Sequence, residues 1–174
     1  TWSVENGDTN AALRLTTSMW RFWEIRGDYR EGLDWFERAL ALSETEDELR
    51  ARALSCAGAL ARNQSQYAAA ERCFSAALAI YEQLNDRLGV ARMLNGLGTV
   101  AYFHDAAAAI NHFEAALNMH RELNNQRDMA GTLNNLALLA EGQGDYLRAA
   151  TLHQQALELF RALGEDANTA YVLG

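Results

Sequence analysis

The chain contains no Lys and no Pro, and only two of its 174 residues are Cys. Without Lys there is neither a Schiff-base lysine nor a complete Walker A phosphate loop. The two cysteines, Cys56 and Cys73, lie 17 residues apart and form no C-x-x-C pair, which argues against a disulfide scaffold or a zinc site. The lack of Pro suits helices that are joined by short turns.

Long hydrophobic runs are also missing. No stretch approaches the roughly 18 apolar residues of a membrane span, and no basic segment followed by an apolar one opens the chain. Hydrophobic residues make up 49% and charged residues 22%, as in soluble globular proteins. We therefore expect a cytoplasmic protein without a membrane partner. Because the sequence starts at Thr1 and stops at Gly174 within a helical pattern, we expect a piece of a longer protein.

Apolar residues recur every three or four positions throughout, which predicts helices and no sustained strand. An equivalent small residue returns after 38, 39 and 40 residues, at Ala39, Ala77, Ala116 and Ala156. A repeat of this length is one helical hairpin, which must stack on its neighbours to bury its apolar face. The sequence predicts one all-α domain over 1–174, a right-handed α-solenoid with helix pairs at 10–26 and 30–43, 47–63 and 67–85, 87–103 and 106–124, 128–142 and 146–163, and a fifth from Asn168.

The turn inside each pair has its own signature. Gly27-Asp28-Tyr29 and Gly144-Asp145-Tyr146 combine a Gly, which suits a helix exit, with an Asp that can cap the next helix. The third turn, His104-Asp105-Ala106, has lost one residue. In the first repeat, Trp20 stands where later repeats have Gly or Ala, and Gly32 stands where they have Ala. We expect Trp20 to lie over Gly32, because such an exchange conserves core volume.

This pattern resembles the tetratricopeptide repeat family, which has small and aromatic residues at set places. The resemblance covers nearly the whole chain, although the family's Pro at the repeat end is missing and the period is longer. The string 133–137 is similar to the longer repeats of kinesin light chains and of bacterial signalling regulators. The resemblance to the tetratricopeptide repeat family implies a non-catalytic module that binds proteins or peptides. The residues that carry the likeness are Tyr67, Ala70, Phe74, Ala77, Leu97-Gly98, Leu136-Ala137, Tyr146, Ala149 and Ala156.

The aromatic-rich first repeat, 20–29 with 35–40, looks like the start of the repeat arm in large bacterial transcription regulators of the MalT and AfsR kind. Those regulators, which are LuxR-like ATPases of the STAND class, join a nucleotide-binding switch and a DNA-binding domain to a sensor arm. The likeness implies a role in signal-responsive transcription regulation, as the part that binds a partner or an effector.

In the resembled family the first helix of each pair lines the concave surface. Four first-helix windows, 12–26, 49–63, 88–103 and 128–142, hold seven Arg against three acidic residues in a chain of net charge −8. Such segregation would steer an anionic protein, peptide, C-terminal carboxylate or small effector into the groove. The predicted ligand-binding residues are Arg14, Thr17, Arg21, Arg52, Ser55, Arg62, Arg92, Asn95, Thr99, Tyr102, Asn134 and Asn135.

Other interpretations stay open for these residues. A single Arg can equally be solvated or paired with a neighbouring acid, and the two Asn can satisfy backbone groups between repeats. Exposed solenoid ends could instead pair two copies into a homodimer scaffold. RNA recognition by helical repeats is disfavoured by the acidic balance and the absence of Lys.

The sequence contains no residue pattern that is typical of a catalytic site or a metal site. The four His, at 104, 112, 120 and 153, provide no adjacent pair on a helix face, because Ala116 occupies the turn between His112 and His120. His153 replaces an aromatic core residue, and we expect it to pack with one nitrogen hydrogen-bonded. No nucleophile, base and orienting group converge, so the sequence predicts no enzyme activity, no metal and no cofactor.

Overall fold

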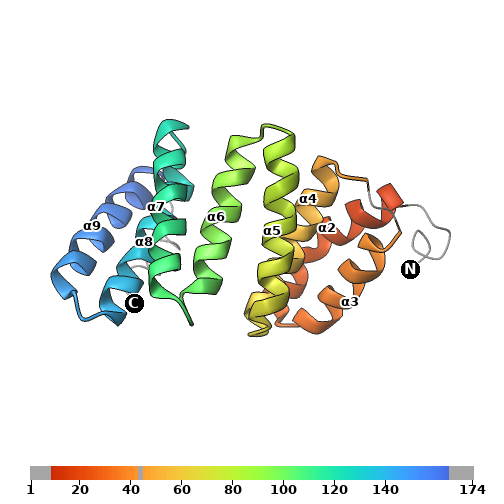
Figure 1. Ribbon diagram of the computed structural model, residues 1–174, viewed down its shortest axis with the longest axis horizontal. Coiled ribbons are helices and arrows are strands. Elements are labelled where there is room, and N and C mark those ends of the chain that lie inside the picture. Colours follow the sequence, from red (N-terminus) through yellow and green to blue (C-terminus); the bar gives the residue numbers. More distant parts are fainter. Residues whose placement is uncertain (1–8, 43–44, 165–174) are drawn as a thin grey trace.

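The computed structural model describes residues 9–42 and 45–164, which form eight helices and no strand. The helices follow one another as four hairpins in a single stack (Figure 1). This confirms the predicted all-α repeat fold, while the fifth pair expected from Asn168 lies outside the described residues. The pairs are α2 (Thr9–Arg26) with α3 (Tyr29–Leu40), α4 (Glu48–Asn63) with α5 (Tyr67–Gln83), α6 (Arg87–Ala101) with α7 (Ala106–Glu122), and α8 (Gln126–Gly142) with α9 (Tyr146–Ala162).

The second helices end earlier than the apolar spacing predicted. Helix α5 stops at Gln83 and α7 at Glu122, two residues before the expected ends. Asn85 and Asn124 follow with φ of 55° and 53°, in the left-handed region that ends helices. Asn tolerates this conformation better than most other residues with a side chain, so these two Asn residues favour the end of the helix at these places.

The starts of the helices are held by short polar side chains. The carboxylate of Asp86 accepts from the amides of Leu88 and Gly89, at 3.1 and 3.0 Å. Asp145 caps α9 as the turn signature predicted. Asp28 does not cap α3 and instead pairs with Arg26, at 3.2 Å between Oδ2 and Nε. Only one of the two Gly-Asp turns therefore works as expected.

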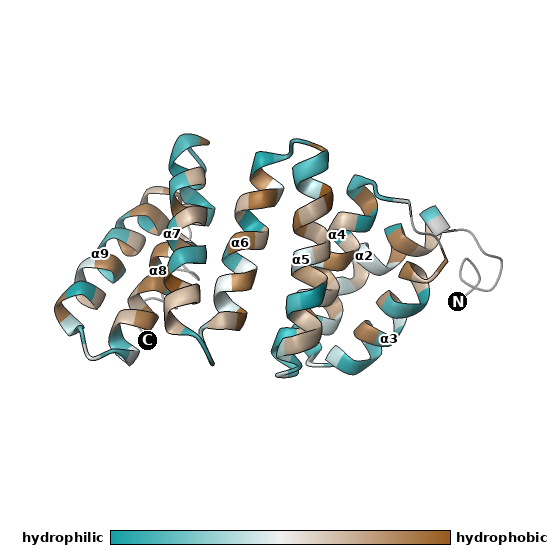
Figure 2. Cartoon of the chain, in the orientation of Figure 1, coloured by the Kyte–Doolittle hydropathy of each residue, from teal (hydrophilic) through white to brown (hydrophobic). Residues whose placement is uncertain are grey.

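The second and third hairpins each place an aromatic ring of the second helix on a glycine of the first. A Cβ atom added to Gly58 would lie 2.8 Å from the Phe74 ring, and one on Gly98 would lie 2.5 Å from Phe113. The rings therefore fill the space that a side chain would take. Hydrophobic and hydrophilic residues alternate within every helix, as expected for helices with one packed face (Figure 2).

The first repeat uses a different large residue from the one expected. Trp23 is 2% exposed and lies against Gly32, whose added Cβ would meet the indole at 3.0 Å. Trp20 is only half-buried, so the prediction that it covers Gly32 is wrong. Helix geometry explains the error, because residues three apart share a face. Trp23 stands at the position of Ala61 in the second repeat. The large residue that compensates for Gly32 is therefore Trp23, one helical turn after Trp20.

The four first helices lie next to one another, with contacts from α2 to α4, α4 to α6 and α6 to α8, whereas neighbouring second helices are further apart. A stack whose inner members approach more closely than its outer members must curve. The first helices therefore line the concave face, where the sequence placed the binding residues.

Candidate functional site

The ends of the first helices form one edge of the concave face, which we call the C-terminal edge. A cavity of about 430 Å³ lies there, between α4, α6 and α8. We call it the Arg62 pocket, because of its described lining residues Arg62 alone carries a charge. Four of the predicted binding residues meet in it. The lining comprises Arg62, Asn63, Ser65, Tyr67, Thr99, Tyr102, Phe103, Phe113, Asn135 and Leu138.

Hydrogen bonds between repeats fix the polar groups of the Arg62 pocket. The Arg62 guanidinium donates to Thr99 Oγ1 at 3.4 Å and to Asn63 Oδ1 at 3.0 Å. The Asn135 amide donates to Asn95 Oδ1 at 3.1 Å, across 40 residues of sequence. These contacts hold the side chains of three consecutive first helices in one orientation. The side chains therefore lose little conformational entropy when a ligand binds.

The shortened third turn supplies the aromatic wall of this pocket. The turns at Gly27, Ser65 and Gly144 each include a residue with positive φ, but none occurs between α6 and α7. Helix α6 ends at Ala101, and Phe103 stacks on Tyr67 with ring centroids 4.7 Å apart. Phe103 stays 58% exposed. The sequence showed the lost residue but gave no signal that Phe103 would turn toward the preceding repeat.

The starts of the first helices form the opposite, N-terminal edge, which carries charges of both signs. A cavity of about 410 Å³, the Arg52 pocket, lies between α4 and α6, and one of about 440 Å³, the His120 pocket, lies between α6 and α8. Thr17, Trp20, Glu48, Arg52, Ser55, Cys56, Tyr81, Asp86, Leu88, Gly89, Arg92 and Met93 line the first. Arg92, Asn95, His120, Arg127, Asp128, Gly131 and Phe160 line the second.

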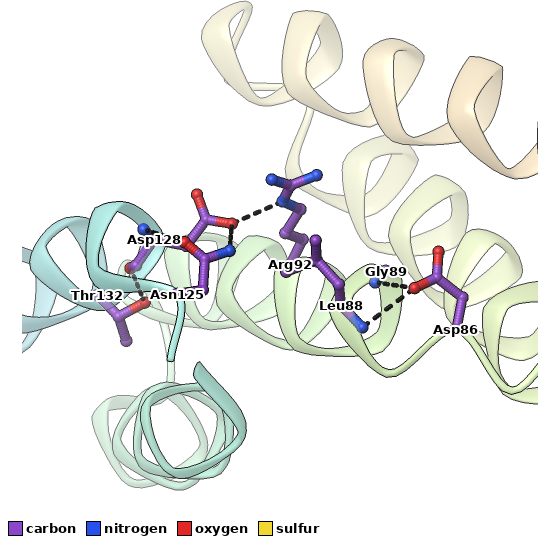
Figure 3. A network of polar contacts seen from close by, with 7 residues as sticks. All are labelled: Asp86, Leu88, Gly89, Arg92, Asn125, Asp128 and Thr132. Atoms are coloured by element: carbon purple, nitrogen blue, oxygen red, sulfur yellow. Dashed lines mark hydrogen bonds and ion pairs between the residues drawn. The ribbon is translucent and has the colours of Figure 1, made fainter. Parts of the chain in front are cut away.

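A polar network joins the repeats along the N-terminal edge (Figure 3). Arg92 Nε donates to Asp128 Oδ2 at 2.7 Å, and the same oxygen accepts from the Asn125 amide at 2.9 Å. Asp86 and Glu48 also line the Arg52 pocket. The charge count over first-helix windows predicted a positive groove, but it left out these two acids, which lie just before the counted residues. This edge therefore combines both signs of charge.

Four further predicted binding residues lie outside the Arg62 pocket, and they differ in how far their side chains are buried. Thr17 and Asn134 are 8% and 5% exposed, and the Thr17 hydroxyl and Asn134 Oδ1 have no partner in the described residues. Arg21 is exposed, pairs with Glu24 at 3.2 Å and lies over the Trp20 ring, outside the pockets described above. Arg14 is exposed and, with Arg52, borders a smaller cavity of about 360 Å³ beside Asp47 and Glu48. Asn134 is thus a buried residue with an unpartnered side-chain oxygen among the described residues.

The cysteines are placed for packing. Burial raises the pKa of Cys56 to about 12 and also raises the pKa of Cys73, so both thiols are protonated at neutral pH. His153 Nε2 lies 3.4 Å from a Glu141 carboxylate oxygen, as expected for a packed histidine with one partner. Among the residues that the structure describes, no three His, Cys, Asp or Glu side chains gather as metal ligands would.

The family assignment follows from this geometry and from sequence comparison. Two tetratricopeptide repeat models match the chain, one over residues 49–122 and one over residues 129–166. Together they cover more than half of the sequence, and the chain belongs to the tetratricopeptide repeat family. Proteins built from these repeats generally bind other proteins. No curated protein matches the sequence.

Solved structures share the fold at low sequence identity. BtubC (BKLC) from P. vanneervenii superposes with a TM-score of 0.71 at 18% identity, over 98% of this chain and 84% of the other. Tetratricopeptide-like repeats of a putative kinesin light chain from Podosopora anserina give 0.70 at 13% identity, over 92% and 84% of the two chains. A variant of those repeats with one residue substituted gives the same values. These similarities support the solenoid fold.

None of the helices in the described ranges is both long and apolar enough to cross a membrane.

Proposed function

We propose that this chain is a non-catalytic module that binds an extended acidic segment of a partner protein along its concave face. The observation that carries this function is the Arg62 pocket, where side chains from three consecutive first helices converge. The first helices of successive repeats are in contact along the concave face. One extended ligand that follows this face would therefore meet several repeats in turn. A carboxylate of the partner, on a side chain or at its C-terminus, is the group that Arg62 would bind.

The chemistry of the pocket suits such a ligand. A guanidinium binds carboxylates through charge-assisted hydrogen bonds, which are stronger than bonds between neutral groups. Thr99 and Asn135 line the same pocket, and their polar side chains can pair with a peptide backbone. Tyr67, Tyr102 and Phe103 provide an apolar wall for the carbon atoms of the segment. No lining carboxylate opposes an anion among the described residues of this pocket.

Binding of a fluorescein-labelled hexaglutamate peptide, measured by anisotropy at pH 7.5, tests this function. Arg62→Gln should weaken binding about tenfold, because the charge-assisted hydrogen bond contributes about 1.5–3 kcal/mol. Arg72→Gln on the second helix α5 is the matched control, since Arg72 is exposed and lies outside the described pockets. Equal affinities for the two variants would show that the Arg62 pocket is not the binding site.

The larger biological setting is a further part of this proposal. The aromatic sequence of the first repeat supports a sensor or interaction arm of a bacterial signal-responsive transcription regulator. Trp23 and Phe36, which belong to that sequence, pack edge to face with centroids 6.1 Å apart, so part of this aromatic sequence packs between α2 and α3. Fusing the chain to a reporter regulator and comparing it with the Arg62→Gln fusion would test this setting.

A second candidate function is self-association, which one surface of α2 supports. Leu15, Met19, Phe22 and Ile25 are 55%, 44%, 46% and 78% exposed and recur at helical spacing. Three of the four equivalent positions of α4 hold buried residues, which are Ala53, Ala57 and Leu60. Sedimentation at several concentrations would test this idea, and Phe22→Glu should abolish any dimer. A monomer at all concentrations would exclude this second function.

A further inference from the structure

His120, near the end of α7, is a buried polar residue that the proposed function does not use. Its side chain has 0% exposure, and neither Nδ1 nor Nε2 has a hydrogen-bond partner in the described part of the chain. Buried polar nitrogens without partners are rare and destabilising, so each calls for a physical explanation. The imidazole also forms part of the lining of the His120 pocket.

One side chain of a repeated row is missing at the pocket beside His120. Arg14, Arg52 and Arg92 stand at equivalent places on the first three first helices, and the fourth has Gly131 there. A Cβ atom added to Gly131 would find nothing within 4 Å. The position that an Arg side chain would occupy in the fourth repeat is therefore open.

The position of His120 is apolar or weakly polar in the neighbouring repeats. Tyr81 and Phe160 hold the equivalent places on α5 and α9, and both are buried. A phenyl ring therefore satisfies the packing at this position without any polar partner. The imidazole adds a group that can gain a proton near neutral pH, which neither neighbour can do.

The charged groups that face this imidazole come from two helices. Arg92 on α6 and Arg127 on α8 carry positive charge, and Asp128 on α8 carries negative charge. Phe160 faces the pocket from α9 and adds no charge. Burial lowers the pKa of His120, while Asp128 raises it and Arg92 lowers it by smaller amounts. The imidazole is therefore neutral at pH 7.5 and adds no charge of its own to the pocket.

We infer that the His120 pocket is a proton-coupled carboxylate subsite, which takes an acidic side chain of the bound segment together with a proton on His120. This inference rests on the proposed function, since the segment must follow the concave face to reach the pocket. The protonated imidazole gains an anionic partner, and the open space beside Gly131 gives room for the side-chain rotation that brings the two together. The carboxylate remains ionised and no covalent bond changes.

Thermodynamic linkage fixes the direction of the pH effect. A bound carboxylate favours the charged form of the imidazole and so raises the pKa of His120. The affinity for the acidic segment must then increase as the pH falls from 7.5 to 5.5. The subsite would make the module bind its partner more tightly in a mildly acidic environment.

An NMR titration with N-acetylated triglutamate tests the subsite on the whole chain. The imidazole resonances of each His are followed from pH 5 to 8, with and without the peptide. We expect the peptide to raise the pKa of His120 by about 0.5 unit or more, equivalent by linkage to about threefold tighter binding to the protonated form. The half-buried His112 should not respond. An unchanged His120 titration in the presence of saturating peptide would overturn the inference.

Two pairs of variants identify the pocket. His120→Phe should remove the pH-dependent gain in affinity, and it should fold because Phe160 occupies the same place in the next repeat. His120→Tyr, which copies Tyr81 of the second repeat, is the second variant if the first does not fold. Gly131→Leu should fill the pocket and abolish the His120 response, whereas Gly131→Ala should retain it. A response that survives in Gly131→Leu would contradict the assigned pocket.

The variant Arg62→Gln separates this inference from the proposed function. Weaker binding at pH 7.5 with an unchanged His120 response supports both ideas. Unchanged binding with the His120 response overturns the proposed function alone. Weaker binding in Arg62→Gln without any wild-type His120 response overturns the subsite alone.

Discussion

The two edges of the concave face differ in how their arginines are used. At the C-terminal edge, Arg62 lies among neutral and aromatic residues. At the N-terminal edge, Arg92 is bound to Asp128, and acids from helix starts line the same cavities. Asp86 and Asp128 lie at the starts of α6 and α8, whereas no acidic residue lines the Arg62 pocket among the described residues. Both edges join the repeats, the N-terminal edge through an ion pair and the C-terminal edge through hydrogen bonds between neutral groups and from Arg62 to Thr99.

Gly89→Ala should produce the largest effect, on the packing of the N-terminal edge. A Cβ atom at Gly89 would lie 2.4 Å from the Tyr81 ring, so the ring must move. We expect a loss of about 1–3 kcal/mol in the free energy of unfolding, measured by urea denaturation. Gly131→Ala is the control and should stabilise the protein by about 0.5–1 kcal/mol, because its site is open. Equal effects at both glycines would show that the packing at Gly89 is misassigned.

Asp86→Ala should produce the next largest effect. Its carboxylate accepts from two amides at the start of α6. Removal of an N-cap of this kind costs about 1 kcal/mol of stability. Ser75→Ala, at an exposed place in α5, is the control and should change stability little. A thermal unfolding midpoint that is unaltered in Asp86→Ala would indicate that the cap does not stabilise the N-terminal edge.

Much of this organisation could be predicted from the sequence. The repeat period and the hairpins follow from the helical spacing of apolar and small residues, and four residues of the Arg62 pocket follow from the resemblance to the tetratricopeptide repeat family, whose first helices line the concave surface. The aromatic wall could not be predicted, because the path of Phe103 depends on the conformation of a shortened turn. The charge of the N-terminal edge was not predicted, because a count restricted to helix windows excluded Asp86 and Glu48. The sequence showed that His120 stands at the position of Tyr81 and Phe160 in the neighbouring repeats, but it did not predict that His120 would line a pocket.

Arg92→Gln should have a smaller effect on stability. The guanidinium is half exposed, and exposed ion pairs contribute about 0.2–1 kcal/mol. We expect a loss of this size in denaturant titrations at low salt, and a smaller loss in about 1 M NaCl, where charges are screened. Arg72→Gln should show no such salt-dependent difference. A loss that is the same at both salt concentrations would mean that packing, rather than charge, explains the contribution of Arg92.

The smallest expected effect is a pH dependence of stability without any ligand. The pKa of His120 is lowered in the folded protein, so the unfolded chain binds more protons as the pH falls below about 6.5. Stability should therefore be complete above that pH and decrease below it, until the folded-state pKa is reached. His120→Phe should remove this part of the acid sensitivity in urea titrations at pH 7.5 and 5.5. His112→Phe should leave it in place.

The central claim is that the C-terminal edge binds the partner. Its most direct test compares Arg62→Gln with Arg92→Gln in one anisotropy titration of hexaglutamate at pH 7.5, where His120 is neutral. We predict a loss of affinity of about tenfold for Arg62→Gln and less than about twofold for Arg92→Gln. The reverse order, or equal losses in both variants, would contradict the account.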